Sequence, residues 1–200
     1  MRYFPGRGAR KRTNTTAFIL KCLLLSSIAL MMTPGMLARD FLTDQEIRLM
    51  QNVQPIDKRT GVYMDAAAVR LQTAKDRFEG KESDPGDALE FYSQEEMLED
   101  YYQILEHVMI VVDEAFDEPR RRENINIKKA LQNLKSAMSR NLGRLAALKR
   151  QAEGKKKEEL WNRINSAIDI TDGIRDGADE GLSRIARQEA EDAKDPRRSR

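Results

Sequence analysis

The side chains that most often carry catalysis are scarce in this chain. Its 200 residues include one histidine, His107, and one cysteine, Cys22. Zinc sites of the HExxH type, three-histidine sites and the Glu-x-x-His pairs of di-iron bundles all need at least two histidines. On its predicted helix His107 falls opposite the apolar stripe, so we expect it on the outer face beside Asp100, Gln103 and Glu114. These residues predict neither a metal centre nor a histidine-based catalytic site.

Motifs that bind nucleotides or activate a serine are also missing. The sequence contains no GxxxxGK[ST], GxGxxG or GxSxG pattern and no CxxCH for covalent haem. Acidic side chains are abundant, and one group recurs at helical spacing: Asp169, Asp172, Asp176 and Asp179. Because EF-hand ligands wrap around a turn, we interpret this edge as a solvated helix face. We therefore predict no catalytic residue, no cofactor, no metal and no enzymatic activity.

Three glycines in the last predicted helix form a candidate contact surface. Gly173, Gly177 and Gly181 are spaced by four, as in the GxxxG pairs through which helices approach closely. One interpretation is a smooth strip that a second helix, from this chain or another, contacts. The other is a locally weak or bent helix, since three glycines cost a helix about 3 kcal/mol relative to alanines. The residues leave both interpretations open.

Charge is segregated by predicted helix. Residues 94–118 contain nine acids and no Lys or Arg, residues 119–153 contain ten basic residues and two acids, and residues 158–192 contain ten acids and four arginines. One interpretation places the basic helix between the two acidic ones. Each exposed pair is worth only about 0–1 kcal/mol, but together such pairs would select the neighbours and the antiparallel register.

The second interpretation of this charge is functional. Lys129, Arg140 and Arg144 are expected on an outer face, where they would be available to a protein partner or to an anionic component of the cell envelope. Nucleic acid is not expected as the partner, because the amino terminus predicts export. Self-association through the glycine strip is the other contact that the sequence suggests.

The amino terminus has the layout of a secretory signal peptide. Five basic residues stand within the first twelve positions, an apolar run covers residues 22–32, and Pro34 then precedes the small residue Ala38. The run of 11 residues is shorter than the roughly 20 needed to cross a bilayer. We therefore predict a signal peptide over residues 1–38, with export to the periplasm or the medium. The alternative is an uncleaved segment that anchors the protein in the inner membrane. Cleavage would also remove the only cysteine, and with it any disulfide.

The remainder of the chain predicts helices. A capping box at Thr43 and Glu46 indicates a short first helix, and Pro55 is expected as the first residue of the second. Residues 79–92 are expected to form a long exposed loop because they include Gly80, Pro85 and Gly86. The helix after the loop should begin at the capping box Ser93-Gln94-Glu95-Glu96. Its expected stripe is Leu98, Tyr101, Leu105, Val108, Met109, Val112 and Phe116.

Two more long stretches with apolar residues at every third or fourth position follow, the first expected to begin at Pro119. With 34% charged and 6% aromatic residues and no strand-like alternation, the chain predicts an all-α fold. We expect an antiparallel up-down bundle of four long helices preceded by a short helix, spanning residues 39–192, with coiled-coil-like packing. Residues 193–200 are expected to be a charged flexible tail.

Two segments resemble small exported helical proteins found in bacterial genomes. One is the stretch of residues 100–106, DYYQILE. The other runs from Leu42-Thr43 to Arg70-Leu71 and includes Glu46-Ile47, Gln51, Gln54, Ile56-Asp57-Lys58-Arg59, Tyr63 and Ala66-Ala67. The resemblance implies an all-helical envelope protein with no assigned activity. We expect a non-enzymatic interaction or structural module of the envelope. The alternative is a binder of a small or amphipathic ligand in a cavity between helices, lined by Tyr101, Met109, Phe116, Met138 and Trp161.

Overall fold

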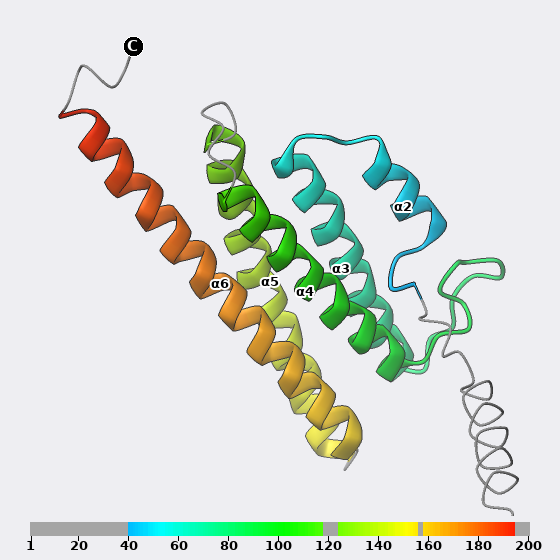
Figure 1. Cartoon of the computed structure of the whole chain (residues 1–200). Helices are drawn as coiled ribbons and strands as arrows, with labels where there is room; N and C mark the ends of the chain where they lie inside the picture. The colour runs from blue at the N-terminus through cyan, green and yellow to red at the C-terminus, as the bar shows by residue number, and fades with distance from the viewer. Residues whose placement is uncertain (1–39, 118–123, 156–157, 195–200) are drawn as a thin grey trace, which may run out of the picture. The chain divides into compact units, whose positions relative to one another are not determined.

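The computed structural model describes residues 40–117, 124–155 and 158–194, which form five helices with no strand among them (Figure 1). The helices are α2 (Asp44–Gln51), α3 (Ile56–Phe78), α4 (Gln94–Asp117), α5 (Asn124–Lys155) and α6 (Glu158–Asp192). The predicted bundle of four long helices preceded by a short one is confirmed. The signal peptide over residues 1–38, the helix start at Pro119 and most of the 193–200 tail lie outside the described residues.

Both predicted capping boxes are present. The backbone N–H of Thr43 donates to a Glu46 carboxylate oxygen at 2.7 Å, and the backbone N–H of Glu46 donates to the Thr43 hydroxyl at 3.3 Å. Ser93 and Glu96 form the same reciprocal pair, at 2.8 and 3.2 Å. Each pair satisfies two amide groups that a helix start leaves without partners. Pro55 stands one position earlier than predicted, as the N-cap rather than the first helical residue of α3.

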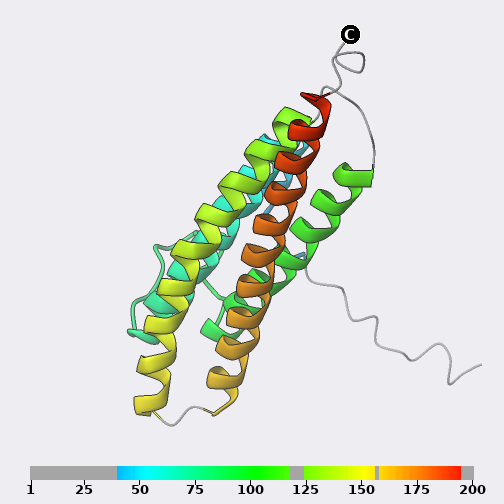
Figure 2. The ribbon, with the colours of Figure 1, turned by 90° about the vertical axis from the view of Figure 1, so that its left-hand side faces the viewer.

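The long helices form a four-cornered bundle with an unexpected order. Consecutive helices run in opposite directions, but α4 and α5 lie across a diagonal and contact each other at few residues (Figures 1 and 2). Helix α4 packs mainly on α3 and α6, and α5 also packs on α3 and α6. The pairs α3 with α5 and α4 with α6 are therefore parallel neighbours.

This order contradicts the expectation that the basic helix lies between the two acidic ones. The basic helix α5 has the acidic α6 on one side and α3 on the other, whereas the acidic α4 and α6 are neighbours. The physical reason is that apolar burial contributes more free energy than exposed ion pairs do. Burial of one apolar side chain contributes about 1.5–3 kcal/mol, while an exposed ion pair contributes about 0–1 kcal/mol. The fit of the apolar stripes therefore determines which helices become neighbours.

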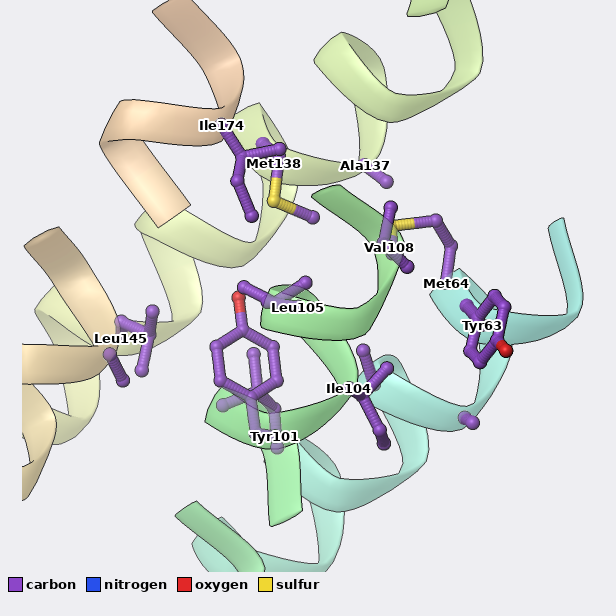
Figure 3. Close-up of a cluster of buried hydrophobic side chains, with 14 of the residues drawn as sticks. Tyr63, Met64, Tyr101, Ile104, Leu105, Val108, Ala137, Met138, Leu145 and Ile174 are labelled. Atoms are coloured by element: carbon purple, nitrogen blue, oxygen red, sulfur yellow. The ribbon is translucent and has the colours of Figure 1, made fainter. Parts of the chain in front are cut away.

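The core contains most of the residues that the predicted stripes identify. Figure 3 shows Tyr101 and Leu105 of α4 close to Met138 and Leu145 of α5, and all four side chains are fully buried. Met109 is a correction, because it is 43% exposed. It follows the buried Val108 directly, and adjacent residues on a helix point about 100° apart, so only one of the two faces the core.

The segment between α3 and α4 is held more firmly than an exposed loop. Glycines with positive φ occur at Gly80 (78°) and Gly86 (87°), where other residues would be strained. The side chain of Arg77 donates hydrogen bonds to the backbone carbonyls of residues 81, 89, 90 and 92. Leu89 is only 5% exposed, so the prediction that the whole loop is exposed is wrong at this residue.

Candidate functional site

Two of the three predicted basic residues line a groove between α3 and α5, which we call the basic groove. Its volume is about 350 Å³. It is lined by Leu71, Gln72, Lys75, Arg140, Gly143, Arg144, Leu145, Ala147, Leu148 and Gln151. The buried side chains Leu71, Leu145 and Leu148 form its floor. Three cationic side chains therefore surround an apolar floor, with two amides beside them.

The helical spacing of α5 explains why Arg140 and Arg144 share this rim. They are separated by one helical turn, next to the buried residues Leu145 and Leu148, and both are exposed. Lys75 adds a third charge from α3, with its Nζ 3.7 Å from Glu79 and its side chain 49% exposed. The rim thus has three positive charges, one of them beside a carboxylate, and this excess makes the groove attractive to an anion.

Lys129, the third predicted basic residue, lies elsewhere on α5 and has a different environment. Its Nζ lies 3.2 Å from Oδ2 of Asp57 in α3, and the Asp57 side chain is only 6% exposed. A carboxylate with so little access to water needs a cation nearby. We therefore assign Lys129 to the packing of α5 on α3 and not to the basic groove.

The three glycines do not form a single contact strip. A Cβ atom at Gly181 would lie 3.0 Å from Cδ1 of Leu131 and 3.3 Å from Cζ of Phe116, so glycine there leaves room for these two side chains without a shift. A Cβ atom at Gly173 or Gly177 would meet nothing within 4 Å. The side chains that approach Gly181 come from α4 and α5 of the same chain. Gly173 and Gly177 are exposed, and contact of a second chain at these two positions stays a prediction.

A second groove, which we call the acidic groove, lies between α4 and α6 and has a volume of about 650 Å³. It is lined by Leu98, Glu99, Tyr102, Glu159, Asn162, Arg163, Ser166, Asp169 and Ile170. Arg163 bridges the two helices, since its guanidinium lies 2.9 Å from Glu99 and 3.5 Å from Glu159. Three carboxylates against one arginine leave this groove with a negative charge.

The order of the helices places the two grooves on opposite faces of the bundle. Helix α4 carries eight acids and no Lys or Arg, and α5 carries eight Lys or Arg and one acid. Because α4 neighbours α6 and lies diagonally across from α5, the acidic groove and the basic groove open in opposite directions. The bundle therefore has one negative and one positive face.

A buried charged cluster connects the segment around α2 to α3 and α4. Arg70 of α3 is only 1% exposed, and its guanidinium donates to both carboxylate oxygens of Glu46, at 2.9 and 2.7 Å. It also donates to the backbone carbonyl of Phe41 at 2.9 Å, and its Nε lies 3.6 Å from Oδ2 of Asp100. Burial by itself would raise the pKa of Glu46, but the hydrogen bonds and charge of Arg70 and the bonds of Thr43 outweigh it and lower that pKa.

The sequence predicted His107 on the outer face of its helix, and this prediction is wrong. Its ring centroid lies 5.3 Å from that of Tyr63 in α3 and 5.7 Å from that of Phe41, which precedes α2. Asp100, expected beside it on the surface, is only 6% exposed. Helix α3 and the segment at Phe41 cover this side of α4, so the outer face inferred from the apolar stripe alone was too wide.

The five residues expected to line a ligand cavity do not do so together. Tyr101 and Met138 are fully buried in the packed core. Neither Met109, Phe116 nor Trp161 lines the basic or the acidic groove. The two grooves are thus different from the predicted cavity, which stays a prediction.

In the part of the chain that the structure describes, no group of three or more His, Cys, Asp or Glu side chains is arranged to hold a metal ion. Over the same residues, no helix has the length and apolar character of a membrane span. Comparison with known protein families, curated proteins and solved structures finds no match for this chain.

Proposed function

We propose that this protein is a non-enzymatic interaction module of the cell envelope that holds an acidic segment of a partner protein in its basic groove. The observation that carries the proposal is the arrangement of Lys75, Arg140 and Arg144 around an apolar floor. An amphipathic acidic helix presents carboxylates on both sides of an apolar row, which is the complementary pattern. The charges would steer the encounter, and the floor would add apolar contact.

A peptide-binding experiment tests this function. A Glu-rich amphipathic helical peptide with a fluorescent label should bind the purified protein, and a Lys-rich peptide of the same apolar pattern should not. Arg140→Glu/Arg144→Glu should weaken binding by about tenfold or more. Arg150→Glu/Arg187→Glu is the matched control, since it changes the net charge equally at exposed positions outside the groove. Equal weakening by both variants would contradict a specific groove.

The same variants separate a protein partner from a lipid surface. Vesicles of phosphatidylglycerol present an anionic plane instead of a helix, and any cationic face attracts them. We expect binding to such vesicles to be weak and equally reduced by the groove variant and its control. Strong vesicle binding that depends on Arg140 and Arg144 alone would mean that the partner of the groove is an anionic envelope component and not an acidic protein segment.

Export is the second part of the proposal, and the sequence of residues 1–38 supports it. The basic start, the 11-residue apolar run and Ala38 are the features of a cleaved signal. Native mass spectrometry of the protein from the envelope fraction of a bacterial host should give the mass of residues 39–200. An intact amino terminus that needs detergent for recovery would instead indicate an anchored protein.

The acidic groove favours a second candidate function, the binding of a small amphipathic ligand. Its volume of about 650 Å³ lies within the range of ligand sites, about 300–1,000 Å³. Leu98, Tyr102 and Ile170 provide apolar contact there, and Glu99 and Asp169 would attract a cationic group. A small adduct in the native mass spectrum that disappears in Glu99→Gln/Asp169→Asn would support this candidate. An adduct that persists in that variant would exclude this groove.

A further inference from the structure

We propose that the acidic segment held in the basic groove is helix α4 of a second copy of this chain. This inference rests on the proposed function and names its partner. The segment consists of Glu106, Ile110 and Glu114, which we call the acidic ridge. These residues are spaced by four, so they lie on one face of α4, and all three are exposed.

The acidic ridge has the alternation that the groove requires. Ile110 is 53% exposed, an unusual position for a large apolar side chain, and a carboxylate stands one turn away on each side. No Lys or Arg occurs anywhere in α4, so the helix cannot neutralise its own carboxylates. Insertion into the groove would cover Ile110 with apolar contact and bring Glu106 and Glu114 towards Arg140 and Arg144.

The lengths of the two surfaces are compatible. At 1.5 Å per residue, the ridge from Glu106 to Glu114 spans about 12 Å, and the α5 side of the groove from Arg140 to Gln151 spans about 16 Å. A face two helices wide and as long as α3 would cover about 700 Å² per copy, near the roughly 800 Å² per partner of specific complexes. The acidic ridge is therefore short enough to lie along the groove.

The ridge and the groove cannot meet within one molecule. Helix α4 lies diagonally across the bundle from α5, so the two surfaces face away from each other. A contact between different surfaces on two copies is head-to-tail, and repeated contacts of this kind build a closed ring or an open chain. We therefore expect assemblies that grow with concentration and do not stop at a symmetric dimer.

Sedimentation velocity with complementary variants tests the inference. The wild-type protein should form assemblies larger than dimers at about 50 mM salt, and raising the salt to about 300 mM should weaken them roughly tenfold. The groove variant Arg140→Glu/Arg144→Glu and the ridge variant Glu106→Lys/Glu114→Lys should each be monomeric. Arg150→Glu/Arg187→Glu, the control, should assemble as the wild type does.

Mixing gives the decisive result. The groove variant keeps an intact ridge, the ridge variant keeps an intact groove, and the reversed ridge also complements the reversed groove. An equal mixture of the two monomeric variants should therefore form assemblies in which the two variants alternate in a one-to-one ratio. A chain with all four substitutions should assemble again, because both charges are then reversed. A wild-type monomer under the low-salt conditions, or a mixture that does not pair, would overturn the inference. If that monomer still binds the Glu-rich peptide through Arg140 and Arg144, the proposed function stands and only the second copy is excluded.

Discussion

Two regions of this molecule, the core layer around Leu105 and the attachment of residues 41–52, are stabilised by different forces. In the core layer the contacts are apolar, and Leu105, Met138 and Leu145 are fully buried. Helix α2, in contrast, has no buried residue, and its link to the bundle depends on the ion pair of Glu46 with Arg70. Partly buried Phe41, Leu42 and Met50 add a smaller apolar contact.

The two regions should therefore respond differently to change. Apolar burial is lost in proportion to the atoms removed, so core substitutions give graded effects on the whole bundle. A buried ion pair behaves otherwise, since removing one partner leaves the other charge without compensation and without water. We expect damage to the ion pair to release residues 41–52 while the four long helices stay folded.

The largest expected effect is that of Arg70→Met. The substitution leaves Glu46 and Asp100 close to an apolar side chain, at a cost of about 3–5 kcal/mol. Because Glu46 can regain water by detaching, the cost should appear as release of residues 41–52. The NMR signals of His107, the only histidine, report this directly through its ring contact with Phe41. Lys58→Met, at an exposed site on α3, should leave those signals in place.

Leu105→Ala tests the contribution of the apolar core layer. Leu105 is fully buried, and truncation of such a residue costs about 2–5 kcal/mol of unfolding free energy. Urea denaturation followed by circular dichroism should show this loss in one transition of the whole bundle. Val69→Ala is the control, since Val69 is 47% exposed and its change should stay within about 0.5 kcal/mol. A release of residues 41–52 without loss of global stability would contradict the distinction between the two regions.

The apolar stripes and the two capping boxes could be predicted because they are local. A helix start needs partners within three residues, as at Thr43 and Glu46, and a stripe reflects one helix's own periodicity. The order of the long helices could not be predicted in this way. Any amphipathic helix satisfies its stripe against several neighbours, so the diagonal position of α4 and α5 depends on side-chain fit across the bundle.

The buried charged cluster was not identified from the sequence, although charged residues stand at positions of the apolar stripes. Arg70 lies three residues after Ala67 and four before Ala74, so it continues the buried stripe of α3. Asp100 occupies the equivalent position between Met97 and Ile104 in α4. A charged residue at a stripe position indicates a buried pair, but its partner Glu46 is 24 residues away and only the fold brings them together. For the basic groove, charge and spacing identified Arg140 and Arg144, whereas Lys75 needed the α3–α5 contact.

Acid should disrupt the ion pair of Glu46 with Arg70 at a higher pH than the one at which the apolar core unfolds. The pKa of Glu46 is lowered in the folded protein, so its contribution is fully present above its ordinary value of 4.5 and is lost as the pH falls through the lower folded value. The backbone amide NMR signals of α2 should therefore move towards random-coil positions below about pH 4, while those around Leu105 keep their native positions. Glu46→Gln should detach α2 without this pH dependence. Simultaneous loss of both sets of signals would mean that the two regions unfold together.

The smallest expected effect lies inside the core, where one polar contact interrupts the apolar layer. The Tyr101 hydroxyl lies 2.7 Å from Oγ1 of Thr171, and because that threonine donates its own proton to the carbonyl of Ala167, Tyr101 is the donor. Tyr101→Phe removes this bond and should cost about 1 kcal/mol in urea denaturation. Burial raises the pKa of Tyr101 to about 12 and outweighs the smaller lowering effect of its polar neighbours.

The raised pKa gives this substitution a second readout. A phenol whose folded pKa lies above its ordinary value of 10.0 stabilises the fold below that value, and the contribution is lost as the pH rises through about 12. Phenolate absorbance should therefore show a late step near pH 12 in the wild type that is absent in Tyr101→Phe. Tyr102→Phe, at the less buried neighbouring position, should keep the late step and change stability by less than about 0.5 kcal/mol. Absence of the late step from the wild type would mean that Tyr101 is not isolated from water, and the core layer would then resemble the α2 attachment more than the packing indicates.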